Sequence, residues 1–302
     1  FLEEKIFQYP NISETAFSIN LLGLSLNVQW YGLSYIAGIL LAWYFMAKLV
    51  KNKDLWFASH SIIERSEVDD LITYMILGII IGGRLGYCLF YAPGYYFENP
   101  IKVIYVWEGG MSFHGGFLGV IMSGALYGVR KKINLLSLGD LIAFASPPGL
   151  FFGRIANFIN GELWGKPTTS VFGIEFTKGQ GQFCPNPNEL PCLRHPSQLY
   201  EAFFEGIILM LIFYYLVFVS KALRKPGIIF GSFLLGYGVI RFSIEFLREA
   251  DAFFISNENP YGYVVQVIPG IGISMGQLLT VPMIVFGFFM ILLVNKRTIH
   301  EN

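Results

Sequence analysis

The chain of 302 residues is 54% hydrophobic and 14% charged, and its 21 basic and 21 acidic residues give a formal net charge of zero. Because soluble domains carry about 25% charged residues, this composition indicates an integral membrane protein. A net charge of zero gives no support to nucleic-acid binding.

Apolar runs of bilayer-crossing length predict an all-α integral membrane protein in which the whole chain forms a single transmembrane domain. About seven transmembrane helices are expected, at residues 28–50, 71–91, 113–129, 138–159, 198–219, 227–247 and 278–294. Gly78, Gly82 and Gly86 fall on one face of the second span, where they permit close approach of another helix. Pro147 and Pro148 should break or kink the fourth span midway.

The connecting segments are expected outside the bilayer core. Residues 1–26 should be interfacial, and the aromatic segment 92–112 should lie along the membrane surface. Residues 160–197 are rich in glycine, proline, asparagine and threonine, so they should form a small extramembrane head. A short strand is predicted within this head, at residues 171–176.

Basic residues at the ends of the predicted spans indicate the orientation. With the N-terminus outside, twelve of the 21 lysines and arginines lie on the inner side and six on the outer side. The inner ones are Lys48, Lys51, Lys53, Arg65, Arg130, Lys131, Lys132, Lys221, Arg224, Lys225, Lys296 and Arg297. The positive-inside rule therefore predicts N-out and C-in, with the head at the outer face. An oxidising compartment there would permit a disulfide between Cys184 and Cys192, and the alternative is unrelated thiols.

The stretch from Gly153 to Gly165 places Arg154 where an apolar span gives way to a polar loop. A cation in or near the lipid core is costly, so it usually faces the protein interior and pairs with an anionic group. On a helix, Arg154, Asn157 and Gly161 would share one face. The structural alternative is an arginine that extends to the interface while asparagines cap the helix end.

The sixth span carries a second polar stripe. Its members follow the i, i+4, i+8, i+11 pattern of one helix face: Tyr237, Arg241, Glu245 and Arg248. Two arginines around a glutamate fit a structural ion-pair network. They also fit an anion site in which the glutamate orients the arginines, because the planar guanidinium matches phosphate.

Two further candidates belong to the same predicted membrane face. His114 precedes Gly115 and Gly116, which let a backbone or a ligand approach, and histidine transfers protons near neutral pH. A lone histidine is nevertheless more often structural. Tyr31, near the outer end of the first span, fits either an aromatic belt or a substrate contact. Arginines beside a base suggest that this face handles an anionic lipid head group.

Hydrolases and nucleotide-driven pumps are not expected, and neither an H-E-x-x-H motif nor a Walker A motif occurs. No metal, cofactor or nucleotide is expected. An anion transporter or channel would carry polar residues on to the inner face, but the inner halves of the spans are largely apolar. A lipid-binding scaffold without catalysis is the other alternative.

The stretch Gly153-Arg154-Ile155-Ala156-Asn157-Phe158-Ile159-Asn160-Gly161-Glu162-Leu163-Trp164-Gly165 resembles the signature of the bacterial prolipoprotein diacylglyceryl transferase family. Other segments match the same family in the same order: Trp30-Tyr31-Gly32, His114-Gly115-Gly116, His195 to Glu201, and Tyr237-Gly238 with Arg241, Glu245 and Arg248. The resemblance covers nearly the whole chain. Ala156 stands where many members have glycine, and Phe117 where leucine is common.

The resemblance implies the reaction and the partners. A diacylglyceryl group would pass from phosphatidylglycerol to the lipobox cysteine thiol of a prolipoprotein signal peptide. The product is a thioether, glycerol phosphate leaves, and this is the first step of bacterial lipoprotein maturation. The chain would then be a multi-pass protein of the bacterial cytoplasmic (inner) membrane, with its active site toward the periplasmic leaflet.

The residues fit this chemistry because a thiolate is the nucleophile and negative charge stays on the departing phosphate. His114 would be the base or proton shuttle, and Arg154 and Arg241 would hold the phosphate. The remaining substrate-binding candidates orient the head group, fix the arginines or contact substrate: Tyr31, Asn157, Asn160, Glu162, Tyr237, Glu245 and Arg248.

Overall fold

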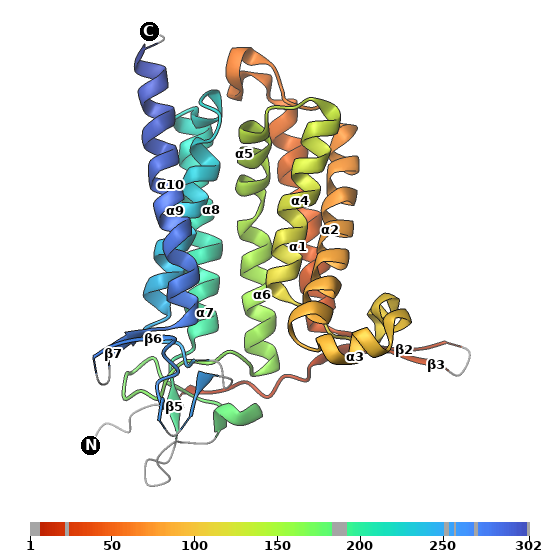
Figure 1. The fold of residues 1–302 in the computed structure, drawn as a ribbon, viewed down its shortest axis with the longest axis vertical. Helices are drawn as coiled ribbons and strands as arrows, with labels where there is room; N and C mark the ends of the chain where they lie inside the picture. The colour runs from red at the N-terminus through yellow and green to blue at the C-terminus, as the bar shows by residue number, and fades with distance from the viewer. Residues whose placement is uncertain are drawn as a thin grey trace.

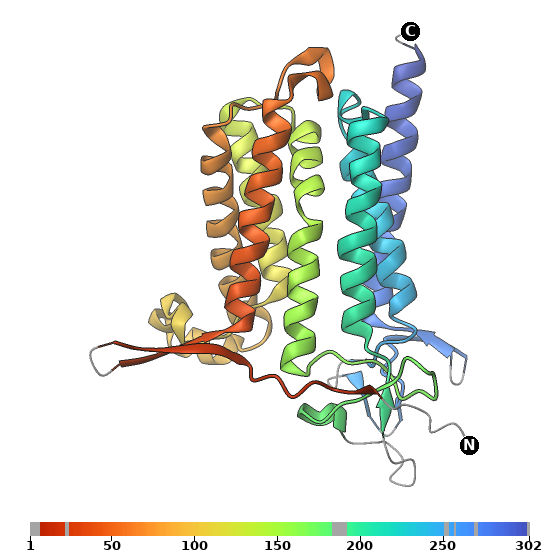
Figure 2. The same cartoon turned by 180° about the vertical axis from the view of Figure 1, so that it is seen from behind.

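The computed structural model describes residues 7–21, 24–182, 192–250, 254–256, 258–268 and 271–300, and most of them are helical. The long helices run side by side in one bundle, with short strands and loops gathered at one end (Figures 1 and 2). The bundle is built from α1 (Trp30–Lys51), α2 (Glu67–Phe90), α4 (Phe113–Lys131), α5 (Leu135–Ala145), α6 (Pro147–Asn160), α7 (Ser197–Glu201), α8 (Leu209–Tyr214), α9 (Ile228–Ile244) and α10 (Met275–His300).

Five helical segments of the described chain are long and apolar enough to cross a membrane: Trp30–Lys51, Glu67–Phe90, Leu135–Asn160, Ser197–Val219 and Met275–Lys296. The shorter α9 has 17 residues, and α4 is not among the five. The prediction of a mostly helical, multi-pass membrane protein is thus confirmed, while seven crossings stay a prediction. Val28 and Gln29 were placed in the first span, but they end strand β3 (Leu24–Gln29).

Two predicted spans have internal irregularities. The predicted break in the fourth span is confirmed, because α5 ends at Ala145 and α6 begins at Pro147. Proline has no N–H and its ring clashes with the preceding turn, so a helix rarely continues through it. The fifth span is one continuous helix in which π-helical turns, Ala202–Ile208 and Tyr215–Val219, flank α8.

Glycines allow α2 and α4 to pack backbone against backbone, as the glycine spacing predicts. A Cβ at Gly82 would overlap the carbonyl oxygen of Gly115, and one at Gly119 would overlap that of Gly78. A Cβ at Gly86 would lie 2.8 Å from the Gly115 Cα. Small residues at such crossings let helices approach closely enough for dispersion contacts along their whole length.

Short strands and turns form the end of the bundle that we call the head end. The all-α prediction needs correction here, because three small sheets occur among the described residues: β1–β4–β5, β2–β3 and β6–β7. Their strands are β1 (Phe7–Gln8), β2 (Thr15–Leu21), β3, β4 (Ile174–Glu175), β5 (Leu193–Arg194), β6 (Val265–Ile268) and β7 (Ile271–Ile273). The two-residue strands β1, β4 and β5 pair with segments remote in sequence, so hydrophobic periodicity does not reveal them.

The predicted head at residues 160–197 lies at this end, and the strand expected at 171–176 is the two-residue β4. β1 pairs with β4 in parallel, and the segment after β1 passes below α6 (Figure 2). The buried Tyr9 hydroxyl lies 2.6 Å from the Phe158 carbonyl oxygen. Burial and the nearby Glu14 raise the pKa of Tyr9 to about 12. Cys184 lies outside the described residues, so its disulfide with Cys192 stays a prediction.

The aromatic segment 92–112 lies at the head end of the bundle, beside α2. It contains α3 (Pro93–Glu98), which lies across the bundle helices in Figure 1. The buried Arg84 guanidinium ties this segment to α2 by donating to the carbonyl oxygens of Val103 at 2.9 Å and Lys102 at 2.7 Å. Phe97 and Trp107 are 79% and 74% exposed, which fits a surface segment that presents apolar rings to lipid.

The other end of the bundle, which we call the basic end, carries the α1–α2 connection (52–66), the α4–α5 turn (132–134) and the turn 220–227 (Figure 1). These segments, with the adjoining helix ends, hold the twelve basic residues assigned to the inner side. The main hydrophobic core also lies toward this end and includes Met46, Leu49, Trp56, Leu138, Phe144, Phe213 and Leu223.

Asp140 fixes the start of α9 within this core. Its fully buried carboxylate accepts hydrogen bonds from the backbone N–H of Gly227 and of Phe230, both at 2.7 Å. A helix N-terminus has unpaired N–H groups and a positive dipole end, so a carboxylate there stabilises the helix. Asp140 thereby sets the position of the helix that carries Tyr237 and Arg241.

Candidate functional site

The α6 helix ends in a turn that places its polar side chains at the head end. Gly161 has φ +66°, and the N–H groups of Gly161 and Glu162 return to the carbonyl oxygens of Phe158 and Asn157. This is a glycine-terminated helix end, for which a left-handed residue is needed. One to two turns before it, Arg154 and Asn157 point into the protein, where Asn157 is buried.

Arg154 is ion-paired with two glutamates of the α7–α8 helix. Its Nη1 lies 3.1 Å from Glu201 Oε2, and its Nε donates to Glu205 Oε2 at 3.3 Å. Both carboxylates are fully buried, and the arginine side chain is 14% exposed. An arginine that extends to the interface would have a largely exposed head, so the structure contradicts that alternative. The expected anionic partners are present.

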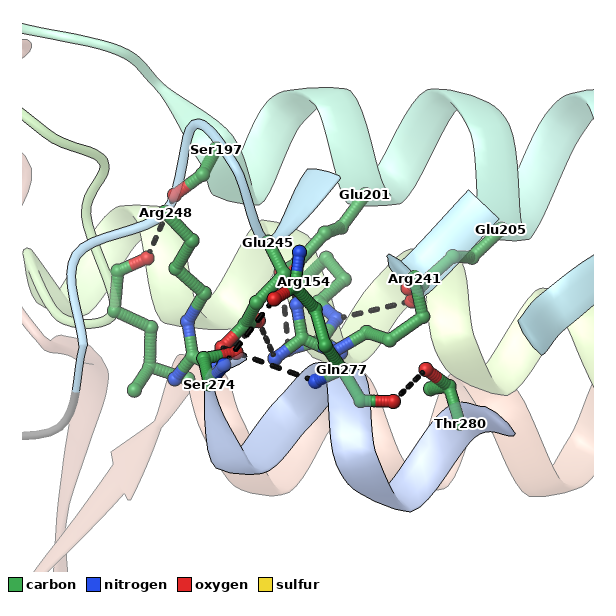
Figure 3. A network of polar contacts seen from close by, with 11 residues as sticks. Arg154, Ser197, Glu201, Glu205, Arg241, Glu245, Arg248, Ser274, Gln277 and Thr280 are labelled. Atoms are coloured by element: carbon green, nitrogen blue, oxygen red, sulfur yellow. Dashed lines mark hydrogen bonds and ion pairs between the residues drawn. The ribbon is translucent and has the colours of Figure 1, made fainter. Parts of the chain in front are cut away.

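Arg241 of α9 converges on the same carboxylate from the other side (Figure 3). Its Nη1 donates to Glu201 Oε1 at 2.7 Å, and its Nη2 lies 2.7 Å from Glu245 Oε2. Glu201 therefore holds one arginine on each of its oxygens, which brings the two guanidinium groups together. The predicted helical stripe holds only in part, because α9 ends at Ile244 and Arg248 lies beyond the helix, but Glu245 still lies 3.8 Å from Arg248 Nη1.

Glu245 in turn ties this stripe to the start of α10. Its Oε1 accepts a hydrogen bond from Ser274 Oγ at 2.9 Å, and Ser274 Oγ accepts one from the Gln277 backbone N–H. A Cβ on Gly276 would lie 2.6 Å from the Glu245 carboxyl carbon, so only glycine lets the first turn of α10 contact this group. The carboxylate lies at a helix N-terminus, where the dipole favours negative charge.

We call this set the arginine network, and its ionised form is electrically balanced. Three arginines and three glutamates from α6, the α7–α8 helix and α9 form it: Arg154, Arg241, Arg248, Glu201, Glu205 and Glu245. Buried charges persist only when paired, and each carboxylate here contacts at least one guanidinium. A guanidinium has five N–H donors, so the ion pairs of Arg154 and Arg241 leave donors for a further anion.

Glu201 was predicted only as part of a matching segment, and Glu205 was not predicted as a site residue at all. The signal was present, because these are acidic residues four apart in an otherwise apolar span, and intramembrane acids are functional candidates. Glu205 lies in the π-helical turn Ala202–Ile208. The next residue, Gly206, lets this helix approach α6, because a Cβ on Gly206 would lie 2.6 Å from the Phe151 Cβ. Such turns recur at functional sites.

Asn157, Tyr31 and Glu162 form a second polar group beside the arginine network. The Asn157 amide lies 2.9 Å from Glu162 Oε1 and 3.3 Å from the Tyr31 hydroxyl. The structure therefore brings α1, α6 and the head together at these predicted residues. Asn160 is also at this end of α6, and its Oδ1 is buried without a hydrogen-bond partner among the described residues.

Tyr237 lies on the arginine-network face of α9. Its ring stacks on Phe233 with centroids 5.6 Å apart, one turn before Arg241. His114 is in the first turn of α4, at the head end, but its side chain lies outside what the structure describes. The structure thus gathers the predicted residues of α1, α6 and α9, and leaves the position of the histidine ring open.

Gly165 and His195 join the head to the end of α9. The Gly165 N–H donates to the His195 carbonyl oxygen at 2.9 Å, and a Cβ on Gly165 would lie 2.5 Å from that oxygen. Lys166 N–H donates to the Leu247 carbonyl oxygen at 2.8 Å. Partial burial lowers the pKa of His195, which keeps the ring neutral at neutral pH.

The expectation that no hydrolase motif occurs needs correction at Ser274. Gly272-Ile273-Ser274-Met275-Gly276 has the G-x-S-x-G spacing of a nucleophile elbow and lies between β7 and α10. A hydrolase serine donates to a histidine base, whereas Ser274 Oγ donates to Glu245 and caps α10. The motif here serves helix capping. A cavity of about 250 Å³ borders Ser274, Glu245, Arg248 and Lys166.

No group of three or more histidine, cysteine, aspartate or glutamate side chains in the described chain is arranged to hold a metal ion. The three glutamates of the arginine network are instead neutralised by guanidinium groups. The arginines of this network present planar guanidinium groups, whose fork geometry suits phosphate.

Comparisons with known proteins agree on one family. A family model described as prolipoprotein diacylglyceryl transferase matches residues 18–293. A phosphatidylglycerol–prolipoprotein diacylglyceryl transferase of Roseobacter denitrificans is 47% identical over 94% of this chain and 96% of its own length. A protein of the same name from Cereibacter sphaeroides is 47% identical over 96% of this chain and 98% of its own length. Another from Rickettsia felis is 45% identical over 96% of this chain and 99% of its own length.

Proposed function

The chain belongs to the prolipoprotein diacylglyceryl transferase family, and from this membership we propose that it transfers the diacylglyceryl group of phosphatidylglycerol to the lipobox cysteine of prolipoproteins. It is a transferase of the first step of lipoprotein maturation. The observation that carries the role of the site is the convergence of Arg154 and Arg241 on the two oxygens of the buried Glu201.

The reaction joins a sulfur and a carbon and releases a phosphate ester. The cysteine thiol loses its proton, and the thiolate attacks the glyceryl carbon that bears the phosphate. The S–C bond forms, the C–O bond breaks, and its electron pair stays on the phosphate oxygen. Glycerol phosphate leaves with one more negative charge than the phosphodiester had, and the thiol proton can neutralise it.

Arg154 and Arg241 hold the phosphate and stabilise the charge that it gains. Glu201 accepts a hydrogen bond from Arg241 and forms an ion pair with Arg154, so both guanidinium groups are already oriented before the lipid binds. Such preorganised donors in a low-dielectric site stabilise a transition state without reorganisation. Because ion pairing leaves the network close to neutral, the phosphate is recognised by directed hydrogen bonds and not by a large net charge.

The neighbouring polar residues position the substrate and the arginines. Asn157 and Asn160 orient the glycerol head group, and the unpartnered Asn160 Oδ1 is available to accept a hydrogen bond from a hydroxyl. Tyr31 and Tyr237 contact the substrate. Glu162 holds Asn157, and Glu245 holds Arg241 and Arg248 as parts of the same support.

His114 is the proposed base or proton shuttle. Its position in the first turn of α4 puts it at the head end, and histidine exchanges protons near neutral pH. A general base contributes about 10² to 10⁴ in rate, so His114→Gln should lower kcat by a factor in that range. A loss below about tenfold would assign His114 a structural role.

We place the protein in the bacterial cytoplasmic membrane with seven crossings, N-out and C-in. α4 and α9 lie among the five longer segments in the bundle (Figures 1 and 2), and the basic end carries the twelve inner lysines and arginines. The positive-inside rule then puts the arginine network and the head toward the outer leaflet. No nucleotide or nucleic acid takes part.

A transfer assay tests this function. The purified full chain in phosphatidylglycerol nanodiscs is mixed with a lipobox peptide, and mass spectrometry follows the peptide. A diacylglyceryl mass gain is expected, and it should vanish when the peptide cysteine is serine or when phosphatidylcholine replaces phosphatidylglycerol. A folded protein that binds the lipid without any mass gain would make it a lipid-binding scaffold.

A further inference from the structure

We propose a second anionic-lipid site at the basic end of the bundle, separate from the arginine network. A shallow pocket of about 320 Å³ opens there, lined by Trp43, Tyr44, Ala47, Lys48, Lys51 and Arg65. The pocket lies between the last turns of α1 and the α1–α2 connection, whereas the arginine network lies at the head end of α6 and α9 (Figure 1). The ligand is the phosphate head group of an acidic phospholipid.

The pocket carries unneutralised positive charge. Lys48 and Lys51 lie in the last turn of α1, and neither forms an ion pair with another described residue. Arg65 pairs with Asp69 at 3.3 Å. Three cations and one carboxylate leave a net charge of +2, enough to attract an anionic phosphate group near a membrane surface.

Aromatic contacts hold the arginine in place at the pocket wall. The Arg65 guanidinium stacks over the Trp43 ring at 4.4 Å from its centroid, and the Trp43 indole N–H donates to Asp69 Oδ1 at 2.6 Å. Trp43 is therefore fixed from both sides, and Arg65 is oriented by stacking and by its ion pair. A preorganised cation loses little side-chain entropy when it binds a ligand.

The shape of the pocket follows from one face of α1. Tyr44, Ala47, Lys48 and Lys51 lie three to four residues apart, so they share a stripe. The small Ala47 between larger neighbours leaves the hollow, and the lysines reach it from the helix end. Toward the bilayer centre the outward surface of α1 is apolar, with Ile36 and Leu40 57% and 59% exposed.

That apolar continuation favours a lipid over a free phosphate. Cations at the helix end meet the head group, an aromatic pair lies at interfacial depth, and exposed aliphatic side chains run beside the acyl chains. A soluble phosphate ester would use the lysines but gain nothing from this surface. The basic character of this end also serves topology, but topology alone requires neither the hollow nor the stacked Arg65.

Tryptophan quenching tests the site in the full-length protein. The chain is placed in nanodiscs of phosphatidylcholine that contain increasing amounts of phosphatidylglycerol with brominated acyl chains, and brominated phosphatidylcholine is the reference. Trp43→Phe identifies the part of the fluorescence that comes from Trp43. We expect Trp43 to be quenched preferentially by the brominated acidic lipid, with saturation at a low mole fraction.

In the Lys48→Ser/Lys51→Ser variant, the mole fraction of acidic lipid needed for half-maximal quenching should rise about thirtyfold, because two cationic contacts are lost. The matched control is Lys132→Ser/Lys221→Ser, which removes two exposed lysines that also lack an ion pair with a described residue at the same end and should leave it unchanged. Equal loss in both variants, or equal quenching by both brominated lipids, would overturn the proposal. Displacement of the acidic lipid by soluble glycerol phosphate would assign the pocket to a free phosphate instead.

Discussion

Arg154 is held by two buried carboxylates, so its removal should affect folding as well as catalysis. Among the described residues, Arg154 is the cation in ion-pair contact with Glu205, while Glu201 retains Arg241. Arg154→Gln would therefore leave one fully buried glutamate uncompensated. Breaking a buried pair in this way costs about 3–5 kcal/mol, which is a large part of the stability of a typical domain.

A charge-balanced double variant separates the two effects. Arg154→Gln/Glu205→Gln removes one charge of each sign and leaves Arg241 and Arg248 against Glu201 and Glu245. The second substitution should restore about 1–3 kcal/mol, the usual coupling of contacting residues. The kcat of this double variant should remain at least about 10² to 10³ below that of the wild type, because one preorganised donor to the developing anion is lost. Glu205→Gln alone should keep activity within about tenfold.

The assay combines unfolding and transfer. Thermal unfolding in detergent, followed by tryptophan fluorescence, gives the stability of the four proteins, and the mass-spectrometric peptide assay gives kcat and KM. An active double variant would remove Arg154 from the mechanism. A single Arg154→Gln variant as stable as the wild type would contradict the inference that Glu205 depends on this arginine.

Three other substitutions test the supporting structure. Asp140→Ala should cost about 3 kcal/mol in unfolding experiments, because two buried N–H groups lose a charged acceptor, while the exposed Asp70→Ala should be neutral. Gly119→Val should cost at least about 1–3 kcal/mol through overlap with the α2 backbone, and Gly124→Ala, which meets only the end of the Ile142 side chain, should cost less. The pKa of His195 is lower in the folded state than in the unfolded state, so the unfolded state binds more protons. The free energy of unfolding should therefore be highest above pH ~6.5 and should fall as the pH drops below that value. The His195→Gln variant should lose less melting temperature on acidification than the wild type.

Local patterns in the sequence carried much of the architecture. The break before Pro147, the glycine face of α2 and the basic residues at one end are all features of single segments, and each appears in the structure. The shared face of Tyr237 and Arg241 was also predictable, because an i, i+4 pattern depends only on the helix that carries it.

Contacts between distant segments were not predictable in the same way. Nothing in the segment around Tyr9 indicates that it would lie against the Phe158 carbonyl oxygen, or that β1 would pair with β4. The pairing of Arg154 with Glu205 likewise depends on a π-helical turn and on Gly206, which together set the rotation of one helix against another. A span is apolar on average even when it carries two buried acids four residues apart, as Glu201 and Glu205 are.

The two ends of the bundle are held together differently. The apolar core and Asp140 lie toward the basic end, where burial and a helix cap fix the helices without any residue of the arginine network. The arginine network joins α6, the α7–α8 helix, α9 and α10 at the head end by ion pairs, which add little net stability because desolvation offsets their attraction. A phosphate that fills the remaining arginine donors would strengthen those helix contacts, so lipid binding should stabilise the fold in proportion to RT ln(1 + [L]/Kd). The network is thus the part of the bundle whose stability depends most on the substrate.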